Sequence, residues 1–280
     1  MADTWEPDQF EEAFVAELGL SQFLPLKTIL MLTPDDYKVY LFRNWSTLMF
    51  LGQAHLLLGS VHHHMQKLAA GEANGLAAVV LRALSGAIVL SLSAALDSLA
   101  GEVDLLLCKG PTEGKVYFGD LAKCKSCNDK PAKCQTCKSD SFRKRLRAFS
   151  ASCPAADAIE ALMAAAEDAK WHEDLRGYRN EAGHRLPALL WLDPCGPQGC
   201  YEVHLLKPGL GNDRVWELFS NYVEATKPED DDLAEPGKLI GQQLQDYLIN
   251  TAAVVDSVWG QLAKHVGGGE AQAEKQDGPA

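Results

Sequence analysis

The sequence predicts a mainly α-helical fold: an up-and-down helix bundle with a small inserted zinc-binding knuckle and a short late β-hairpin. Two long segments, near residues 34–70 and 76–107, place apolar residues three or four positions apart, the spacing of one helix face. After them come two closely spaced pairs of cysteines, and later, turn residues separate two short apolar runs. With 280 residues, 47% of them apolar, the chain can build a substantial core.

The first long helix has a clear start signal. Thr33 suits the N-cap, Pro34 suits the first helical position, and two acids follow at the positive end of the helix dipole. Residues 1–33 form an N-terminal arm with a short amphipathic helix. Ala73-Asn74-Gly75 breaks the long helix, so the next one should run antiparallel to it. The expected core face of the first helix is Leu41, Trp45, Leu48, Leu51, His55, Leu58, His62 and Met65.

The second long helix carries acids where they are unfavourable. Asp97, Glu102 and Asp104 lie toward its C-terminal end, where carboxylates oppose the helix dipole. We therefore expect basic partners for them, or a site that uses them. Because these acids and Arg82 interrupt the apolar run, we interpret it as a buried helix and not as a membrane span. No secretory signal is visible, so we expect a cytoplasmic protein with no membrane partner.

Four cysteines predict a metal site. Cys124, Cys127, Cys134 and Cys137 form two Cys-x-x-Cys pairs with six residues between them. Four thiolates at this spacing suit tetrahedral zinc and, less often, iron and sulfur. They leave no open coordination position, so the zinc should be structural. The short polar segment 109–139 around them would fold as an insertion stabilised by the metal; paired redox thiols are the main alternative.

The remaining elements are shorter. A helix with Phe142, Leu146 and Phe149 on its apolar face follows the insertion, and another starts at Pro154. Its continuation past about residue 170 stays open, because Gly177 and Gly183 weaken the helical pattern.

The last third of the chain contains the hairpin and a final helix. Residues 189–192 and 201–205 should pair as strands. Between them, Cys195 and Cys200 are interpreted as two reduced loop thiols, although they could approach one another. An acidic connector, 227–236, leads to the final helix. The bundle should thus span 34–266, and the low-complexity tail 267–280 should be disordered.

Charge is unevenly distributed along the chain. Residues 109–147 hold eleven basic and four acidic residues, a net charge of +7, so the remainder carries −19 of the total of −12. An acidic body argues against general affinity for nucleic acids, whereas the basic segment could bind phosphates locally. Alternatively, its lysines only balance the charge of a thiolate-bound metal. The short helix contributes Arg143, Lys144, Arg145 and Arg147 to this segment.

The stretch 171–185 concentrates acids, arginines, two histidines and an amide. On a helix, Asn180 and His184 share a face, and Arg179 lies about 100° round from Asn180. An arginine that binds phosphate beside a histidine that moves a proton near neutral pH is a useful catalytic pair. The alternative is a solvated helix face. We expect His172, Glu173 and Asp174 to be ordinary surface residues.

Residues 179–184, Arg-Asn-Glu-Ala-Gly-His, have the form Arg, polar residue, three residues, His. Near the end of a late helix in an all-α chain, this string resembles the signature of the HEPN superfamily. The end of the second long helix, residues 93–102 (Ser-Ala-Ala-Leu-Asp-Ser-Leu-Ala-Gly-Glu), also resembles the core helix of these proteins. The resemblance covers about 34–108 and 140–186. It implies a helix bundle that forms a homodimer, with the two motifs in one cleft.

Many HEPN proteins are metal-independent endoribonucleases of toxin–antitoxin, abortive-infection or CRISPR-linked defence systems, and others keep the bundle without the activity. The resemblance therefore implies RNA as substrate, an antitoxin or sensor protein as a further partner, and Arg179, Asn180 and His184 as site residues. Glu181 and Arg176 are secondary candidates. The main alternative is a non-catalytic module that binds RNA or a protein. A zinc-dependent DNA-binding regulator is a third hypothesis, for which the sequence contains no recognition-helix pattern.

Overall fold

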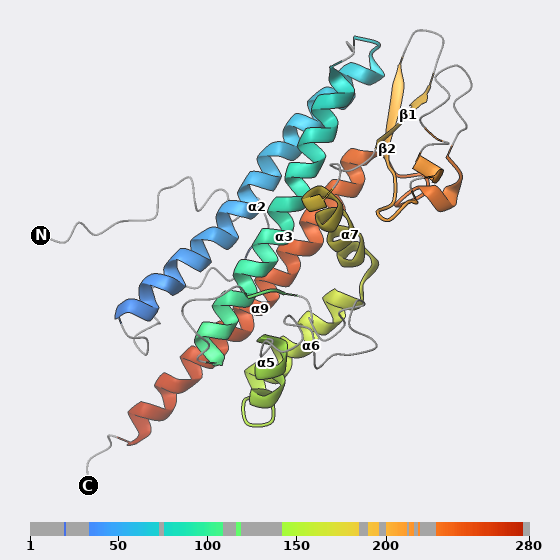
Figure 1. The fold of residues 1–280 in the computed structure, drawn as a ribbon. Helices are drawn as coiled ribbons and strands as arrows, with labels where there is room; N and C mark the ends of the chain where they lie inside the picture. Colours follow the sequence, from blue (N-terminus) through green and yellow to red (C-terminus); the bar gives the residue numbers. More distant parts are fainter. Residues whose placement is uncertain are drawn as a thin grey trace, which may run out of the picture. The chain divides into compact units, whose positions relative to one another are not determined.

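The computed structural model describes Leu20 and residues 34–72, 76–108, 116–118, 142–184, 190–195, 200–211, 213–215, 218 and 228–276. For 34–35, 181–184 and 266–276 it describes the backbone only. The described part is mainly helical and contains one two-stranded antiparallel sheet, which confirms the mainly α prediction (Figure 1). Nearly all of the N-terminal arm and, apart from residues 116–118, the predicted zinc knuckle lie outside the described residues.

The chain divides into two compact units. One comprises Met1–Met49, Ala95–Asp168 and Thr251–Ala280, and the other Phe50–Ala94 and Ala169–Asn250. The sequence predicted a single bundle over 34–266. The helices α2 (Pro34–Ala69), α3 (Ala77–Leu107) and α9 (Ile240–Gln276) each contribute residues to both units.

Helix α2 begins at Pro34, as the capping signal predicts. Leu48, Leu51 and Leu58 are buried, as expected for its core face. Trp45 was also expected on that face, but its side chain is 45% exposed. Near position 45 the exposed strip of α2 also includes Phe42 and Met49, so the apolar residues here exceed what the core takes up.

Helix α3 is the principal buried helix of the described chain. Leu81, Ile88, Leu92, Leu96 and Leu99 are all buried, as the spacing predicts. Within the described ranges, α3 is the one helix long and apolar enough to cross a membrane, judged by length and composition alone. Of its most apolar window, 56% is buried inside the protein. The core helix of a soluble protein has the same properties.

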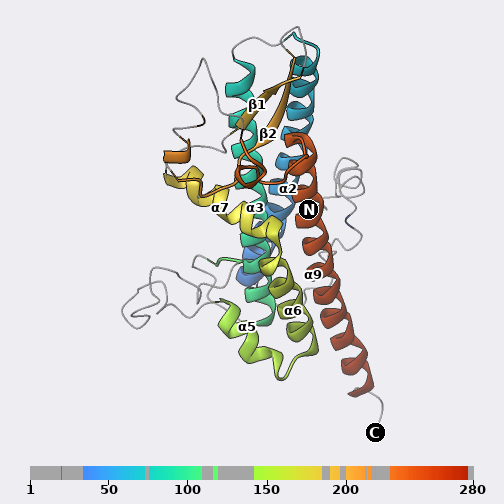
Figure 2. The ribbon, with the colours of Figure 1, turned by 90° about the vertical axis from the view of Figure 1, so that its right-hand side faces the viewer.

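In the first unit, α5 (Phe142–Ser150) and α6 (Pro154–Asp168) lie side by side and are joined by a short turn (Figure 2). Leu146, Ile159 and Met163 fill the space within this unit together with Trp259 of α9. The prediction for α5 was wrong in two side chains. Phe149 is exposed, whereas Arg143 is fully buried.

In the second unit, α7 (Lys170–His184) starts a new helix after α6 ends at Asp168. The hairpin consists of β1 (Leu190–Pro194) and β2 (Tyr201–Leu205), paired from Leu190↔Leu205 to Pro194↔Tyr201. The hairpin prediction is confirmed. Next to the sheet, Trp191 and Leu206 pack with Leu218, Leu210 and Leu233 in a small apolar cluster.

The acidic connector is a folded part of the second unit. Asp230–Asp232 form a 3-10 helix, and Arg214 binds the buried Asp232 carboxylate through Nε and Nη2. Hydrogen bonding from Arg214 lowers the pKa of Asp232. Leu206 and Leu233 form an isolated β-bridge beside this pair. The connector is thereby held against the end of the hairpin.

The final helix is longer than predicted. α9 extends to Gln276, into the segment 267–280 for which the composition predicts disorder. Beyond the glycines 267–269 this segment is rich in Glu, Ala, Gln and Lys, which are among the better helix formers. Local propensity therefore favours helix after these glycines, but it does not explain why the helix continues through them.

Candidate functional site

The predicted site residues lie on α7, which is fixed against the chain that follows β2. Leu175 and Tyr178 are buried, and the Tyr178 hydroxyl donates to the Leu206 carbonyl over 2.8 Å. Gly177 contacts Pro208 so closely that a Cβ on the glycine would lie 2.5 Å from the proline Cβ. Both contacts fix the position and rotation of α7, since each needs one particular helix face toward residues 206–208.

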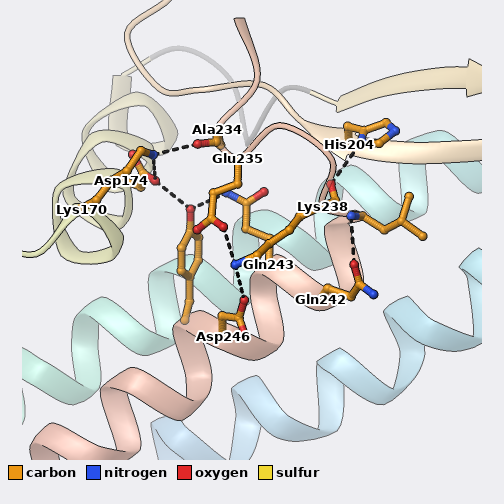
Figure 3. Close-up of polar contacts among 11 residues, drawn as sticks. Lys170, Asp174, His204, Ala234, Glu235, Lys238, Gln242, Gln243 and Asp246 are labelled. Carbon is orange, nitrogen blue, oxygen red and sulfur yellow. Dashed lines mark hydrogen bonds and ion pairs between the residues drawn. The ribbon is translucent and has the colours of Figure 1, made fainter. Parts of the chain in front are cut away.

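A hydrogen-bonded chain holds the first turn of α7 to α9 (Figure 3). Gln243 Nε2 donates to the Tyr247 hydroxyl over 2.7 Å, and that hydroxyl donates to Asp174 Oδ2 over 3.0 Å. Lys170 Nζ lies 2.7 Å from the same carboxylate oxygen and 2.7 Å from the Ala234 carbonyl. Burial, and then the charge of Asp174, raises the pKa of Tyr247, so its hydroxyl stays protonated as a donor.

This arrangement corrects one prediction. His172 and Asp174 were expected at the surface, but both are buried, and only Glu173 of the three is exposed. The physical reason is tertiary: α9 presents Tyr247 to Asp174. One signal in the sequence could have indicated a polar partner for Asp174. Gln243 and Tyr247 lie four residues apart, on one face of a mostly apolar helix.

The opposite face of α7 carries the predicted site. Arg176 and Asn180 are exposed and lie four residues apart on one stripe, which His184 extends by one further turn. Arg179 is half-buried at the border of this face. α7 is helical through His184, so the expected backbone placement of Asn180 and His184 on one face is confirmed. The His184 side chain is outside the described part.

The acids at the end of α3 have partners, as expected. Arg145 binds Asp104 with both branches of its guanidinium, Nε to Oδ1 at 3.0 Å and Nη2 to Oδ2 at 2.6 Å. The carboxylate of Asp97 accepts a hydrogen bond from the Phe118 backbone N–H over 2.9 Å. Asp97 therefore ties α3 to Phe118 within the predicted insertion 109–139, and Asp104 ties α3 to the helix that follows the insertion.

Glu102 is fully buried. Asn44 Nδ2 and Trp259 Nε1 each donate to its Oε2 over 3.0 Å, and Thr47 Oγ1 lies 2.5 Å from its Oε1. Burial raises the pKa of Glu102 to about 7, despite these donors and the nearby charge of Arg43. Its three donors come from α2 and α9, so one carboxyl group links three helices of the first unit.

The arginines of the basic helix α5 form ion pairs with carboxylates of the protein itself. Arg143 is fully buried between Glu160, at 2.7 Å, and Glu167, at 3.5 Å. Arg147 also binds Glu160, at 2.8 Å. Together with Arg145, these arginines neutralise carboxylates of their own unit. The sequence left two roles open for the basic segment, phosphate binding and balance of a metal charge. In the described part of this segment the arginines support neither role, because they form internal ion pairs.

The predicted zinc ligands Cys124, Cys127, Cys134 and Cys137 lie outside the described residues. Among the residues that are described, no group of three or more His, Cys, Asp or Glu side chains could hold a metal ion. Comparisons of the whole chain with protein-family models, with curated proteins and with solved structures gave no match.

Proposed function

We propose that the chain is a HEPN-type endoribonuclease whose active site consists of Arg179, Asn180 and His184. The observation that supports this most is the build of α7. The contacts of Tyr178 and Gly177 and the buried Asp174 chain fix this helix in place, while Asn180, one turn before His184, stays exposed. A catalytic helix needs such support, because small displacements of reacting groups are costly.

In the proposed reaction the 2′-hydroxyl of the RNA attacks the adjacent phosphate. A bond forms between O2′ and phosphorus, and the bond from phosphorus to the 5′ oxygen breaks, leaving a 2′,3′-cyclic phosphate and a 5′-hydroxyl. One proton leaves the 2′-hydroxyl and one is delivered to the 5′ oxygen. His184 serves as the acid or base, because an imidazole titrates near neutral pH.

Arg179 and Asn180 supply the electrostatic part. The guanidinium of Arg179 stabilises the charge that develops on the phosphate oxygens. Asn180, four residues before His184, orients the imidazole or the scissile phosphate by a hydrogen bond. These steps need no metal ion. In the homodimer that the resemblance implies, two copies of the motif would share one cleft, so acid and base could come from two chains.

The test is cleavage of a labelled single-stranded RNA by the purified protein. His184→Ala and Arg179→Ala should each abolish cleavage while leaving the melting temperature unchanged. His63→Ala and Lys67→Ala are matched controls, since both residues are exposed on α2, outside the proposed site. The product should carry a cyclic phosphate, detected because its 3′ end resists tailing until the cyclic phosphate is removed.

A second candidate function is a non-catalytic RNA- or protein-binding module of the same family. The internal ion pairs of α5 favour it, because they leave fewer cations to attract RNA to a chain of net charge −12. Under this alternative, the wild-type protein cuts no RNA, and Arg179→Ala and His184→Ala lower the melting temperature by several degrees. Toxicity on expression that His184→Ala relieves would support the ribonuclease.

We further propose a structural zinc ion held by Cys124, Cys127, Cys134 and Cys137. Metal analysis should give one zinc per chain, and replacing any of the four cysteines by serine should reduce that ratio. At constant ionic strength, added EDTA should leave RNA cleavage intact over short times, since a four-thiolate site has no open coordination position and the proposed chemistry needs no metal. A zinc content near zero in freshly purified protein would rule out this site.

The homodimer is also a proposal, supported by an apolar strip on the first-unit part of α2. Phe42, Trp45 and Met49 are 75%, 45% and 59% exposed at helical spacing. Sedimentation should show a dimer that Met49→Glu weakens. We place the activity in the cytoplasm, where reduced thiols persist; the four described cysteines, Cys108, Cys153, Cys195 and Cys200, are all free.

A further inference from the structure

Cys195 and Cys200 face one another across the open end of the hairpin. The strand register pairs Pro194 with Tyr201, and one step further the same register places Cys195 opposite Cys200. The Cys195 backbone N–H donates to the Cys200 carbonyl over 3.0 Å, so the two strands remain paired at this position. The sequence alone favoured two separate loop thiols.

The spacing of such a pair suits a disulfide. Directly opposed residues in a hydrogen-bonded antiparallel pair have Cα atoms about 5.5 Å apart. Disulfide-bonded cysteines have Cα atoms at roughly 4.4–6.8 Å, most often near that same separation. The Cys200 side chain lies near enough to raise the pKa of Cys195. A covalent bond therefore requires side-chain rotation and little movement of the backbone.

Access to the pair is unequal. Cys195 is exposed, whereas Cys200 is half-buried. Local desolvation, the hydrogen bond and charge of Cys200, and the carboxylate of Glu202 raise the pKa of Cys195. Because Cys195 is the exposed member of the pair, a reagent in solution reaches it first.

We propose that Cys195 and Cys200 form a reversible redox pair that exchanges with small disulfides such as oxidised glutathione. The Cys195 thiolate attacks one sulfur of the reagent, which forms a mixed disulfide and releases one glutathione thiol. The Cys200 thiolate then attacks the Cys195 sulfur, closes the internal disulfide and releases the second glutathione. The pair loses two protons and two electrons, and both electrons reduce the glutathione disulfide. This site is independent of the proposed RNA chemistry.

The full-length protein is equilibrated in glutathione buffers of increasing oxidised fraction, and remaining thiols are then alkylated. Trypsin should release both cysteines within residues 186–214, since it cleaves after Arg185 and Arg214 but not at the Lys207–Pro208 bond between them. We expect this peptide to lose both free thiols together. Because the fold holds the thiols together, half-oxidation should occur at a ratio of oxidised to reduced glutathione roughly tenfold or more below that for urea-unfolded chain.

Serine variants test the order of events. Cys200→Ser should stop at a glutathione adduct on Cys195, and Cys195→Ser should react more slowly because Cys200 is less exposed. Cys108→Ser combined with Cys153→Ser is the matched control and should leave the midpoint unchanged. The proposal is overturned if the 186–214 peptide keeps two thiols, if folded and unfolded chains share one midpoint, or if the wild type ends with glutathione adducts or with either cysteine bonded elsewhere.

Discussion

Replacing Glu102 by glutamine should remove a large pH dependence from the stability of the protein. Burial raises the pKa of Glu102 to about 7 in the folded chain, against 4.5 as the ordinary value. A shift of about 2.5 units corresponds to roughly 3 kcal/mol, at 1.36 kcal/mol per unit. Because the folded-state pKa is the higher one, the protonated carboxyl is favoured by folding. The contribution of this shift to the free energy of unfolding is fully present below pH 4.5 and is lost as the pH rises through 7.

The surrounding groups can accept an amide at this position. The amide oxygen can take the hydrogen bonds from Asn44 and Trp259 that now reach Oε2. Thr47 Oγ1 already lies 3.1 Å from the Arg43 carbonyl, to which it can donate while accepting from the new amide N–H. Glu102→Gln should therefore fold, with little change in stability at low pH and a gain of up to roughly 3 kcal/mol at pH 8.

The measurement is urea unfolding of wild type and Glu102→Gln at several pH values between 5 and 8. The difference in unfolding free energy should grow with pH across that range, as the wild type alone develops a buried charge. Glu173→Gln, at an exposed position on α7, is the matched control and should follow the wild type at every pH. A difference that stays constant from pH 5 to 8 would refute the reasoning, because Glu102 would then titrate alike in folded and unfolded chains.

Three further substitutions follow from the packing. Arg143→Met should cost about 3–5 kcal/mol in urea unfolding, since it leaves two carboxylates without their buried cation; exposed Lys144→Met should stay within about 0.5 kcal/mol. Equal effects of the two would contradict the assigned ion pairs. Gly177→Ala should cost about 1–3 kcal/mol, because its Cβ would overlap Pro208, and adding Pro208→Gly should recover part of that loss. Gly59→Ala, with open space around its Cβ inside α2, should instead raise stability by about 0.5–1 kcal/mol, and a loss on thermal melting would argue against the helix there.

Most of the helices and the hairpin could be predicted because each has a local signal. Periodic apolar residues defined α2 and α3, a Thr-Pro start fixed the first residue of α2, and turn residues bounded the strands. For Glu102 and Asp104, the sequence predicted that compensating partners must exist, but it did not identify them. Acids at the wrong end of a helix require compensation, but their place in the sequence does not say which side chain provides it.

The failures at charged residues have one physical origin. A charged residue is predicted to be exposed unless a tertiary partner offsets its desolvation, and such partners are distant in sequence. Arg143 is buried through Glu160 and Glu167, and Asp174 through Tyr247. For the candidate site, the sequence could predict that Asn180 and His184 share a helix face. It could not predict how Tyr178 and Gly177 fix that helix, because those contacts depend on residues 206–208.

The internal ion pairs of α5 bear on the electrostatic interaction between the chain and a polyanion such as RNA. The three arginines of α5 cancel the charge of Glu160, Glu167 and Asp104, so the rest of the chain still carries the net charge of −12. An RNA strand approaching this molecule is repelled at long range, and dissolved cations weaken that repulsion by screening. Magnesium would then accelerate encounter without being a ligand, and EDTA would slow it by removing a screening ion. Cleavage assays with chelators therefore need a constant ionic strength, set by monovalent salt.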